Sequence, residues 1–303
     1  MKGVFFLVGP TATGKSELAA DVALRVGAEI VSADAFQIYR GLNCLTAKPD
    51  AATLSKVPHH LLGTVGLSEE MNVEMFRRQA GEAIAKIQAG GRRALVVGGS
   101  GLYIKALTHG LSALPPADAA IRRQLNELST EELGARLSEL DPVTTATIDR
   151  QNRRRLIRAL EIYELTGQPA AAQRVTWQSE GAGRVTAVAG VFVFRDRDDL
   201  YARINQRVEQ MFERGVMDEV RDVGPTSATA ERTLGLAELR ALAAGQISRA
   251  DCRAAIQQAT RRYAKRQLTW FRRQSNFEPL NLSCLSHVKA VEWITERVLS
   301  LSR

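Results

Sequence analysis

The feature that most constrains the fold is a short glycine-rich segment, Gly9-Pro10-Thr11-Ala12-Thr13-Gly14-Lys15-Ser16. It has the pattern G-x-x-x-x-G-K-[ST] and follows an apolar run, residues 4–8, that predicts a strand buried on both faces. A helical pattern follows over residues 15–26, where apolar side chains recur four residues apart. Glycines in such a strand-to-helix turn let successive N–H groups approach an anion beside the positive end of the helix. The segment therefore predicts a phosphate-binding loop.

Two side chains of this loop have predicted roles. Lys15 would bring a full positive charge to the outer phosphate, and the Ser16 hydroxyl would join the oxygen shell of a Mg²⁺ ion. The alternative is a glycine-rich turn with a surface lysine, but a chance match at every fixed position with both flanking elements correct is rare. The loop recognises phosphate geometry, so it leaves open which molecule carries the phosphate.

The other apolar segments alternate between strands and helices. We expect strands over residues 29–34 and 93–97 with a helix over residues 73–88 between them, which is typical of a parallel sheet. Residues 115–176 have leucine and alanine at helical spacing, and residues 184–194 supply one more strand. The sequence therefore predicts an α/β fold, a P-loop NTPase-like parallel sheet flanked by helices, with an inserted all-helical subdomain. The expected division is a core over residues 1–114 and 181–303 and a helical insert over residues 115–180.

Composition narrows the classes of partner. The chain has 41 Lys and Arg against 33 Asp and Glu, a formal charge of +8, which favours a polyanionic partner. No apolar run is long enough to span a membrane, and the first one ends without a signal-peptide cleavage site. Three widely spaced cysteines indicate reduced thiols, so we expect a cytoplasmic protein with no membrane partner.

Carboxylates near the loop are scarce. A nucleotide hydrolase ordinarily ends a neighbouring strand with an Asp that holds Mg²⁺, whereas here the strand over residues 93–97 runs into Gly98-Gly99-Ser100-Gly101. Asp34 ends another predicted strand, and parallel topology would bring it to the same edge as the loop. We expect it to bind Mg²⁺ or to act as a general base, and an N-cap of the next helix is the structural alternative.

Two arginine-rich segments predict contacts with nucleic-acid phosphates. Residues 261–273 carry six cationic side chains and no acidic one, and helical geometry places them away from a packing face that includes Tyr263, Gln267 and Trp270. Residues 150–158 carry five arginines at the start of a predicted helix, where they oppose its positive end. A solvated helical face is the alternative for both segments.

Aromatic and histidine side chains have simpler expected roles. Tyr201, Trp270 and Phe271 could stack on bases, but aromatics at helical spacing are more often core residues. His59 and His60 lie in a predicted strand with no Cys or His at ligand spacing, so we interpret both as structural.

Together these segments resemble the bacterial tRNA dimethylallyltransferases, also called tRNA isopentenyltransferases, over nearly the whole chain. The resemblance rests on the order and spacing of seven motifs. They are Gly9 to Ser16; Asp34-Ala35-Phe36-Gln37-Ile38-Tyr39; Thr46-Ala47-Lys48-Pro49; Pro58-His59-His60-Leu61; Val97-Gly98-Gly99-Ser100-Gly101-Leu102-Tyr103; Arg155-Leu156-Ile157-Arg158-Ala159-Leu160-Glu161; and Thr260-Arg261-Arg262-Tyr263-Ala264-Lys265-Arg266-Gln267-Leu268-Thr269-Trp270.

The resemblance implies transfer of a dimethylallyl group from dimethylallyl diphosphate to N6 of the adenosine adjacent to the anticodon of tRNA, with Mg²⁺ as cofactor. The loop would hold the leaving diphosphate, Lys15 would stabilise its charge, and Asp34 would accept the proton of the exocyclic amine. The family also places the Thr11 position among the reacting groups. The partner would be the anticodon stem-loop, with the target base extruded from its stack, and the protein would act as a monomer.

Two further groups of residues follow from the family's pattern. Arg203 and Arg207 would form an additional clamp on the diphosphate. The residues expected to touch tRNA are Asp34, Ala35, Phe36, Gln37, Ser100, Arg122, Arg154, Arg155, Leu156, Ile157, Arg158, Arg232, Thr233, Leu234, Gly235, Leu236 and Ala237.

Four positions depart from the usual pattern of the family. Ala35 replaces the common Ser, Leu45 replaces Gly, and Ser100 replaces Thr but keeps its hydroxyl. Leu236 replaces Tyr, which puts the local tRNA contact around residues 232–237 in doubt. The phosphate loop, Thr11 and Asp34 are intact, so the predicted chemistry is unaffected.

Three competing functions remain open at this point. An adenylate isopentenyltransferase acting on free AMP or ATP needs the same loop and base, but the helical insert and the basic segments argue against it. A P-loop kinase or nucleotide-switched binding module would explain residues 9–16 and leave the later motifs unexplained. A structural RNA-binding protein would not need Asp34.

Overall fold

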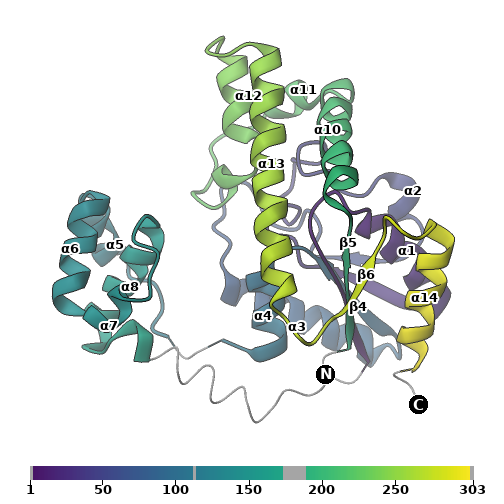
Figure 1. Cartoon of the computed structure of the whole chain (residues 1–303), viewed down its shortest axis with the longest axis horizontal. Coiled ribbons are helices and arrows are strands. Elements are labelled where there is room, and N and C mark those ends of the chain that lie inside the picture. Colours follow the sequence, from purple (N-terminus) through teal and green to yellow (C-terminus); the bar gives the residue numbers. More distant parts are fainter. Residues whose placement is uncertain (1–2, 112–113, 173–188, 301–303) are drawn as a thin grey trace. The chain divides into compact units, whose positions relative to one another are not determined.

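The computed structural model describes residues 3–111, 114–172 and 189–300, and the chain divides into two compact units. One unit consists of Met1–Thr108 and Thr186–Arg303, and the other of His109–Val185. The first contains every strand described, and the second is helical over its described residues (Figure 1).

The first unit is built on one parallel sheet with the strand order β3-β2-β4-β1-β5-β6. The strands are β1 (Val4–Val8), β2 (Ala28–Ser32), β3 (His59–His60), β4 (Arg93–Gly98), β5 (Gly190–Phe194) and β6 (Glu278–Asn281). All five residues of β1 are buried, as a strand with helices on both faces requires. The α/β fold predicted from the sequence is therefore confirmed.

The described helices of the first unit cover both faces of this sheet and form a further layer beside it. They are α1 (Lys15–Val26), α2 (Ala51–Leu54), α3 (Val73–Ala89), α4 (Gly101–His109), α10 (Arg197–Glu213), α11 (Val216–Arg221), α12 (Leu236–Ala243), α13 (Arg249–Arg272) and α14 (His287–Ser300). Phe5 and Leu7 of β1 pack in a core with α1 and α14. Phe6 points to the opposite core, where α3, α4 and the end of α13 cover the sheet (Figure 1). This alternation along β1 buries two separate apolar layers.

Helices α10 to α13 form a further layer of the first unit with their own apolar core. Val208 and Phe212 of α10, Leu239 of α12 and Ile256 of α13 meet there. Figure 1 shows α10, α12 and the first part of α13 standing beyond one end of the strands. The long helix α13 therefore runs from this layer down to the sheet, and it brings residues more than 250 positions from the phosphate loop in sequence against that loop.

The second unit has four described helices, α5 (Ala119–Leu125), α6 (Thr130–Leu140), α7 (Pro142–Thr145) and α8 (Arg153–Thr166). Leucines 125, 133, 137, 156 and 160 form its core. Ser129 and Glu132 make a capping box at the start of α6, which satisfies two backbone N–H groups that the helix leaves unpaired.

Sequence predictions of these elements differ from the structure in a few places. The strand expected over residues 29–34 ends at Ser32, so Asp34 lies in the turn beyond it. The last strand expected near residue 194 begins at Gly190, and the prediction for residues 184–188 falls outside the described residues, as does the helical prediction for 173–176. Strand β6 was missed, because its exposed edge sequence contains Pro279 and shows no apolar alternation. No described helix is long and apolar enough to cross a membrane.

Candidate active site at the phosphate loop

The loop between β1 and α1 has the backbone conformation of an anion-binding turn. Gly14 is the N-cap of α1 and has φ 92°, a left-handed conformation that glycine adopts without strain. A Cβ atom at Gly9 would lie 2.1 Å from the carbonyl oxygen of Val193, so the loop passes directly against β5. These contacts explain why glycine is needed at both ends of the motif.

Lys15 lies folded back onto its own loop. Its Nζ donates to the carbonyl oxygen of Pro10 at 2.5 Å and lies 3.4 Å from Thr13 Oγ1. Desolvation of the ammonium group lowers the pKa of Lys15 to about 7, although Asp34 opposes this shift and Arg207 adds to it. A bound anion would replace the lost solvation of this cation, so the loop is prepared for negative charge.

Three arginines from outside the motif donate hydrogen bonds to the loop. Arg195, which follows β5, donates to Thr13 O at 3.0 Å, and Arg203 of α10 donates to Ala12 O at 3.0 Å. Arg207 of α10 donates to Thr11 Oγ1 at 2.8 Å and to Thr46 O at 3.1 Å. Its Nε is buried without a hydrogen-bond partner among the described residues, and burial lowers the pKa of the guanidinium. The Nε–H of Arg207 is therefore an unused donor, from which a ligand oxygen could accept a hydrogen bond.

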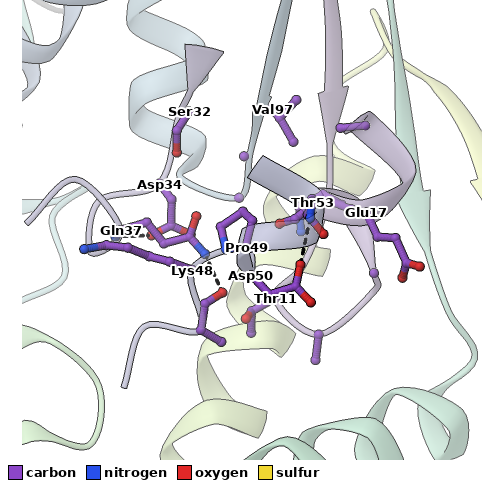
Figure 2. A pocket seen from close by; sticks show the side chains of 18 of the residues that line it. Thr11, Glu17, Ser32, Asp34, Gln37, Lys48, Pro49, Asp50, Thr53 and Val97 are labelled. Atoms are coloured by element: carbon purple, nitrogen blue, oxygen red, sulfur yellow. Dashed lines mark hydrogen bonds between the residues drawn. The ribbon is translucent and has the colours of Figure 1, made fainter. Parts of the chain in front are cut away.

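A cavity of about 520 Å³ lies against the loop. Its walls come from Thr11 to Glu17, from the ends of β2 and β4, from the Lys48–Asp50 segment and from one face of α10. In Figure 2, Asp34, Gln37 and Lys48 lie on one side of the view and Thr53 and Glu17 on the other, with Thr11 between them. Burial lowers the pKa of Lys48 to about 8, so this wall adds a second desolvated ammonium group to the cavity.

Asp34 has one carboxylate oxygen in use and one available. Its Oδ1 accepts from the backbone N–H groups of Phe36 at 2.9 Å and Gln37 at 3.2 Å, which closes the turn after β2. Within the described residues Oδ2 accepts no hydrogen bond. Asp34 therefore closes a turn and does not cap a helix as the sequence alternative had it, since the next helix begins at Ala51, and its second oxygen is left free for a proton.

A second, smaller cavity of about 30 Å³ adjoins the first. Phe36, Thr233, Leu234, Ile256 and Tyr263 are among its lining residues. The rings of Phe36 and Tyr263 lie 5.9 Å apart, and burial, with a contribution from Asp34, raises the pKa of Tyr263.

Three residues, Thr11, Asp34 and Arg207, line both cavities. The first cavity is lined by more cationic than acidic side chains, and half of the residues that line the second are apolar or aromatic. These three residues therefore lie where a molecule in one cavity would meet a molecule in the other.

The glycines at the end of β4 leave no room for a strand-end carboxylate. A Cβ atom at Gly98 would lie 2.2 Å from Ala33 O, and one at Gly99 would lie 2.3 Å from Nε2 of Gln267. Gln267 of α13 fills this place, because its Nε2 donates to Gly99 O and its Oε1 accepts from Thr11 N, both at 2.9 Å. The strand-end Asp that this sequence lacks therefore has no room, because the end of β4 packs against α13.

Of the residues in the first unit that were expected to touch tRNA, some line the cavities, some are exposed elsewhere and one is buried. Asp34 to Gln37, Thr233 and Leu234 lie at or beside the two cavities, and Ser100 Oγ accepts from Ala35 N at 2.9 Å. Arg232 and Ala237 are exposed, whereas Leu236 is completely buried in the core of α10 to α13. Leu45 belongs to the same core, so two of the departures from the family's pattern share one cluster.

Arginines of the second unit serve two different purposes. Arg122 and Arg158 both bind Glu161, which is completely buried, at 2.8 and 2.5 Å. They stabilise this unit internally, while Leu156 and Ile157 are core residues. The side chains of Arg154 and Arg155 are exposed and have no hydrogen-bond or ion-pair partner in the described part of the chain, so they offer free cations.

The basic segment of α13 is exposed along one side. Arg262, Lys265, Arg266, Arg272 and Arg273 are exposed, whereas Arg261 donates to Asn205 Oδ1 at 2.5 Å. Phe271 is 1% exposed, and Trp270 packs over Gly101, where a Cβ atom would lie 2.5 Å from its ring. The core interpretation is confirmed for Phe271, and Trp270 is partly buried against the same core.

The histidines make internal contacts. Nδ1 of His59 lies 2.8 Å from Val57 O, and His60 Nε2 lies 2.6 Å from Glu29 Oε2. Among the described residues no three His, Cys, Asp or Glu side chains gather as a metal site.

Sequence reasoning missed three residues of the site. Arg195 directly follows the apolar run of β5, and Lys48 lies in a motif with no evident chemistry. Gln267 was identified as part of a packing face, and its signal was a polar amide among apolar neighbours on that face.

Comparisons with known proteins agree with this geometry. A family model described as IPP transferase matches residues 37–274. A tRNA dimethylallyltransferase of Akkermansia muciniphila is 42% identical over 294 residues and covers 97% of each chain, and a tRNA dimethylallyltransferase 1 of Citrifermentans bemidjiense is 43% identical over 277 residues, 90% of each chain.

Solved structures give the same result. The tRNA isopentenylpyrophosphate transferase of Bacillus halodurans has a TM-score of 0.71 and 32% identity, covering 100% of this chain and 98% of that chain. A eukaryotic dimethylallyltransferase that acts on tRNA has a TM-score of 0.74 over 93% of this chain and 74% of its own, and at 24% identity it supports the fold alone. The chain belongs to the IPP transferase family.

Proposed function

We propose that this protein transfers a dimethylallyl group from dimethylallyl diphosphate to N6 of the adenosine adjacent to the anticodon of tRNA and releases diphosphate. The observation that carries the proposal is the position of Thr11, Asp34 and Arg207 between a cationic cavity and a small aromatic-lined one. Relatives named tRNA dimethylallyltransferase at about 40% identity support the same reaction.

The cationic cavity suits the diphosphate. The N–H groups of residues 12–16, Lys15, Arg203 and Arg207 would surround the phosphate oxygens, where they stabilise charge as the carbon–oxygen bond breaks and its electron pair passes to the diphosphate. Arg207 would contribute its unpaired Nε donor. Arg203 and Arg207 are held by loop oxygens before substrate binds, whereas the Lys15 ammonium group must turn from Pro10 O toward the phosphate.

The lining of the smaller cavity suits the target base, although a space of about 30 Å³ would have to widen before a purine enters. An extruded adenine would lie near Phe36 and Tyr263, and its N6 would face Asp34. As the N6 lone pair forms the new carbon–nitrogen bond, the amine must lose a proton, which the free Oδ2 of Asp34 would accept. Thr11 would orient the reacting groups through its hydroxyl.

The donors present fit a Mg²⁺ ion that arrives with the diphosphate. Ser16 offers a hydroxyl and Glu17 a carboxylate at the cavity wall, and Mg²⁺ commonly takes its remaining ligands from substrate phosphates and water. The ion would supply further stabilisation of phosphate charge. We assign Ser16 as its protein ligand.

We assign the contacts with tRNA phosphates to exposed cationic side chains. Arg262, Arg266 and Arg273 on α13, Arg232 before α12, and Arg154 and Arg155 on α8 are available for phosphate contacts. Such a surface is not needed for free AMP or ATP, and the closed end of β4 argues against a kinase or hydrolase. The proposal includes action as a monomer in the cytoplasm, with residues 115–180 as the tRNA-binding insert.

An incorporation assay tests the function. Purified protein receives labelled dimethylallyl diphosphate and Mg²⁺ with either unmodified tRNA or free AMP and ATP. We expect label on tRNA with the wild type, and loss of at least about 100-fold in rate for Asp34→Asn, which keeps the turn but removes the base. Asp50→Asn is the matched control, because Asp50 lines the same cavity and its helix-capping bond to Thr53 N is one that Asn also makes. Label on free nucleotide alone, or ATP hydrolysis without label, would refute the proposal.

A further inference from the structure

Gln267 is a buried amide that joins two parts of the site. It is 5% exposed and lies in α13, on the side opposite the exposed arginines. Its Oε1 accepts from Thr11 N and its Nε2 donates to Gly99 O, both at 2.9 Å. A buried side-chain amide that satisfies one loop donor and one strand-end acceptor fixes the distance between them.

The place that Gln267 occupies has a specific meaning in a loop of this kind. It lies at the end of β4, where a hydrolase would carry a carboxylate on the strand itself. Because Gly99 has no side chain, a residue from a helix distant in sequence can approach the loop there. The two glycines and Gln267 therefore form one packing unit.

Thr11 is held from two directions. Gln267 binds its backbone N–H, and Arg207 donates to its hydroxyl oxygen at 2.8 Å. With Oγ1 accepting from Arg207, the hydroxyl hydrogen of Thr11 is directed to another acceptor, and the two cavities on either side of it would hold the substrates. Turning the Thr11 peptide would move both this hydroxyl and the neighbouring N–H groups of the loop.

We propose that Gln267 is a positioning residue for the transfer reaction, which sets the orientation of Thr11 and of the phosphate loop. The kinetic test of this role depends on the proposed function. The pyrophosphate-binding test depends only on the phosphate loop. Because a misplacement of about 1 Å at reacting groups can cost about 100-fold in rate, the amide is expected to affect kcat more than tRNA binding.

Three variants test this role. Gln267→Met keeps length and helix preference but removes both hydrogen bonds. Gln267→Glu keeps the acceptor for Thr11 N and loses the donor to Gly99 O. Gln258→Met makes the same replacement on the exposed face of α13 and serves as the matched control. For each we would measure kcat and the KM for tRNA, the Kd for inorganic pyrophosphate by calorimetry, and the melting temperature.

The expected pattern separates positioning from general destabilisation. For Gln267→Met, kcat falls on the order of 10- to 100-fold, the KM for tRNA stays within about threefold, and the Kd for pyrophosphate rises several-fold. For Gln267→Glu, kcat recovers relative to Gln267→Met while pyrophosphate binds more weakly still, because a carboxylate now faces the anion. Gln258→Met behaves as the wild type.

Two results would overturn the inference. One is a kcat for Gln267→Met within twofold of the wild type with unchanged pyrophosphate binding. The other is a raised KM for tRNA at unchanged kcat, which would assign Gln267 to the tRNA surface. If the wild type itself transfers no label to tRNA, the proposed function fails, and the pyrophosphate Kd of Gln267→Met still decides whether Gln267 orients the loop.

Discussion

The lowered pKa of Lys15 predicts that the loop takes up a proton when it binds an anion. Desolvation brings the pKa of this ammonium group from 10.5 to about 7 in the ligand-free protein. A bound diphosphate supplies negative charge beside Nζ and favours the protonated form. The shift of about 3.5 units corresponds to about 5 kcal/mol of coupling if it is fully reversed.

The number of protons that Lys15 takes up on anion binding depends on the pH. At pH 6 Lys15 is already protonated in the free protein, so binding takes up about 0.1 proton at this group. At pH 8 only about one molecule in ten carries the proton, so uptake reaches about 0.9. Between pH 7 and 10.5 this group alone weakens anion affinity by about tenfold per pH unit, since the proton must be bound along with the ligand.

Calorimetry of pyrophosphate binding in two buffers with different ionisation enthalpies measures this uptake. Pyrophosphate itself exchanges protons, and a parallel titration of Lys15→Met removes that contribution by subtraction. We expect a difference between the two proteins near 0.9 proton at pH 8 that shrinks to about 0.1 at pH 6. A difference below about 0.2 proton at both pH values would refute the argument, because Lys15 would then be charged in the free loop.

Three further predictions concern other parts of the chain. Arg207→Lys should lower kcat/KM about 100-fold in the incorporation assay, because the single nitrogen of an ammonium group cannot replace three separate guanidinium nitrogens that bind Thr11 Oγ1, Thr46 O and the diphosphate. Arg214→Lys at the same cavity wall should cost less than about threefold. Glu161→Gln should lower the free energy of unfolding by about 1–3 kcal/mol in chemical denaturation, a range reduced because both arginine partners are partly exposed, and the pyrophosphate Kd should not change. An unchanged free energy of unfolding would show that the ion pairs contribute nothing. Leu236→Tyr should cost about 1–3 kcal/mol by overpacking, and the cost should shrink in a Leu45→Gly background; strictly additive losses would mean that the two positions do not share space.

Local patterns predicted the parts of the fold that are set locally. The run of β1, the loop glycines and α1 were bounded correctly from sequence, because a buried strand, a left-handed Gly14 and a helical apolar stripe each leave a short-range signature. Asp34 was also located, since parallel topology alone brings strand ends to one edge.

Contacts between distant segments were beyond the same reasoning. The bond from Thr11 to Gln267 spans 256 positions, and nothing near either residue announces the other. The arginines of residues 150–158 illustrate a different limit, because charge counting could not separate Arg158, which binds buried Glu161, from exposed Arg154 and Arg155. A glutamate three residues after Arg158 was the available signal.

The end of β4 explains how a phosphate loop can be turned from hydrolysis to group transfer. Hydrolysis needs a strand-end carboxylate to organise metal and water, and here neither Gly98 nor Gly99 has space for any side chain. The same absence lets α13 approach, so Gln267 reaches the loop while Arg262 and Arg266 remain exposed on the other side of the helix. One helix thus contacts the phosphate loop through one face and presents exposed cations on the other. A carboxylate introduced by Gly99→Asp would displace Gln267 first, so we expect it to abolish transfer without creating ATP hydrolysis.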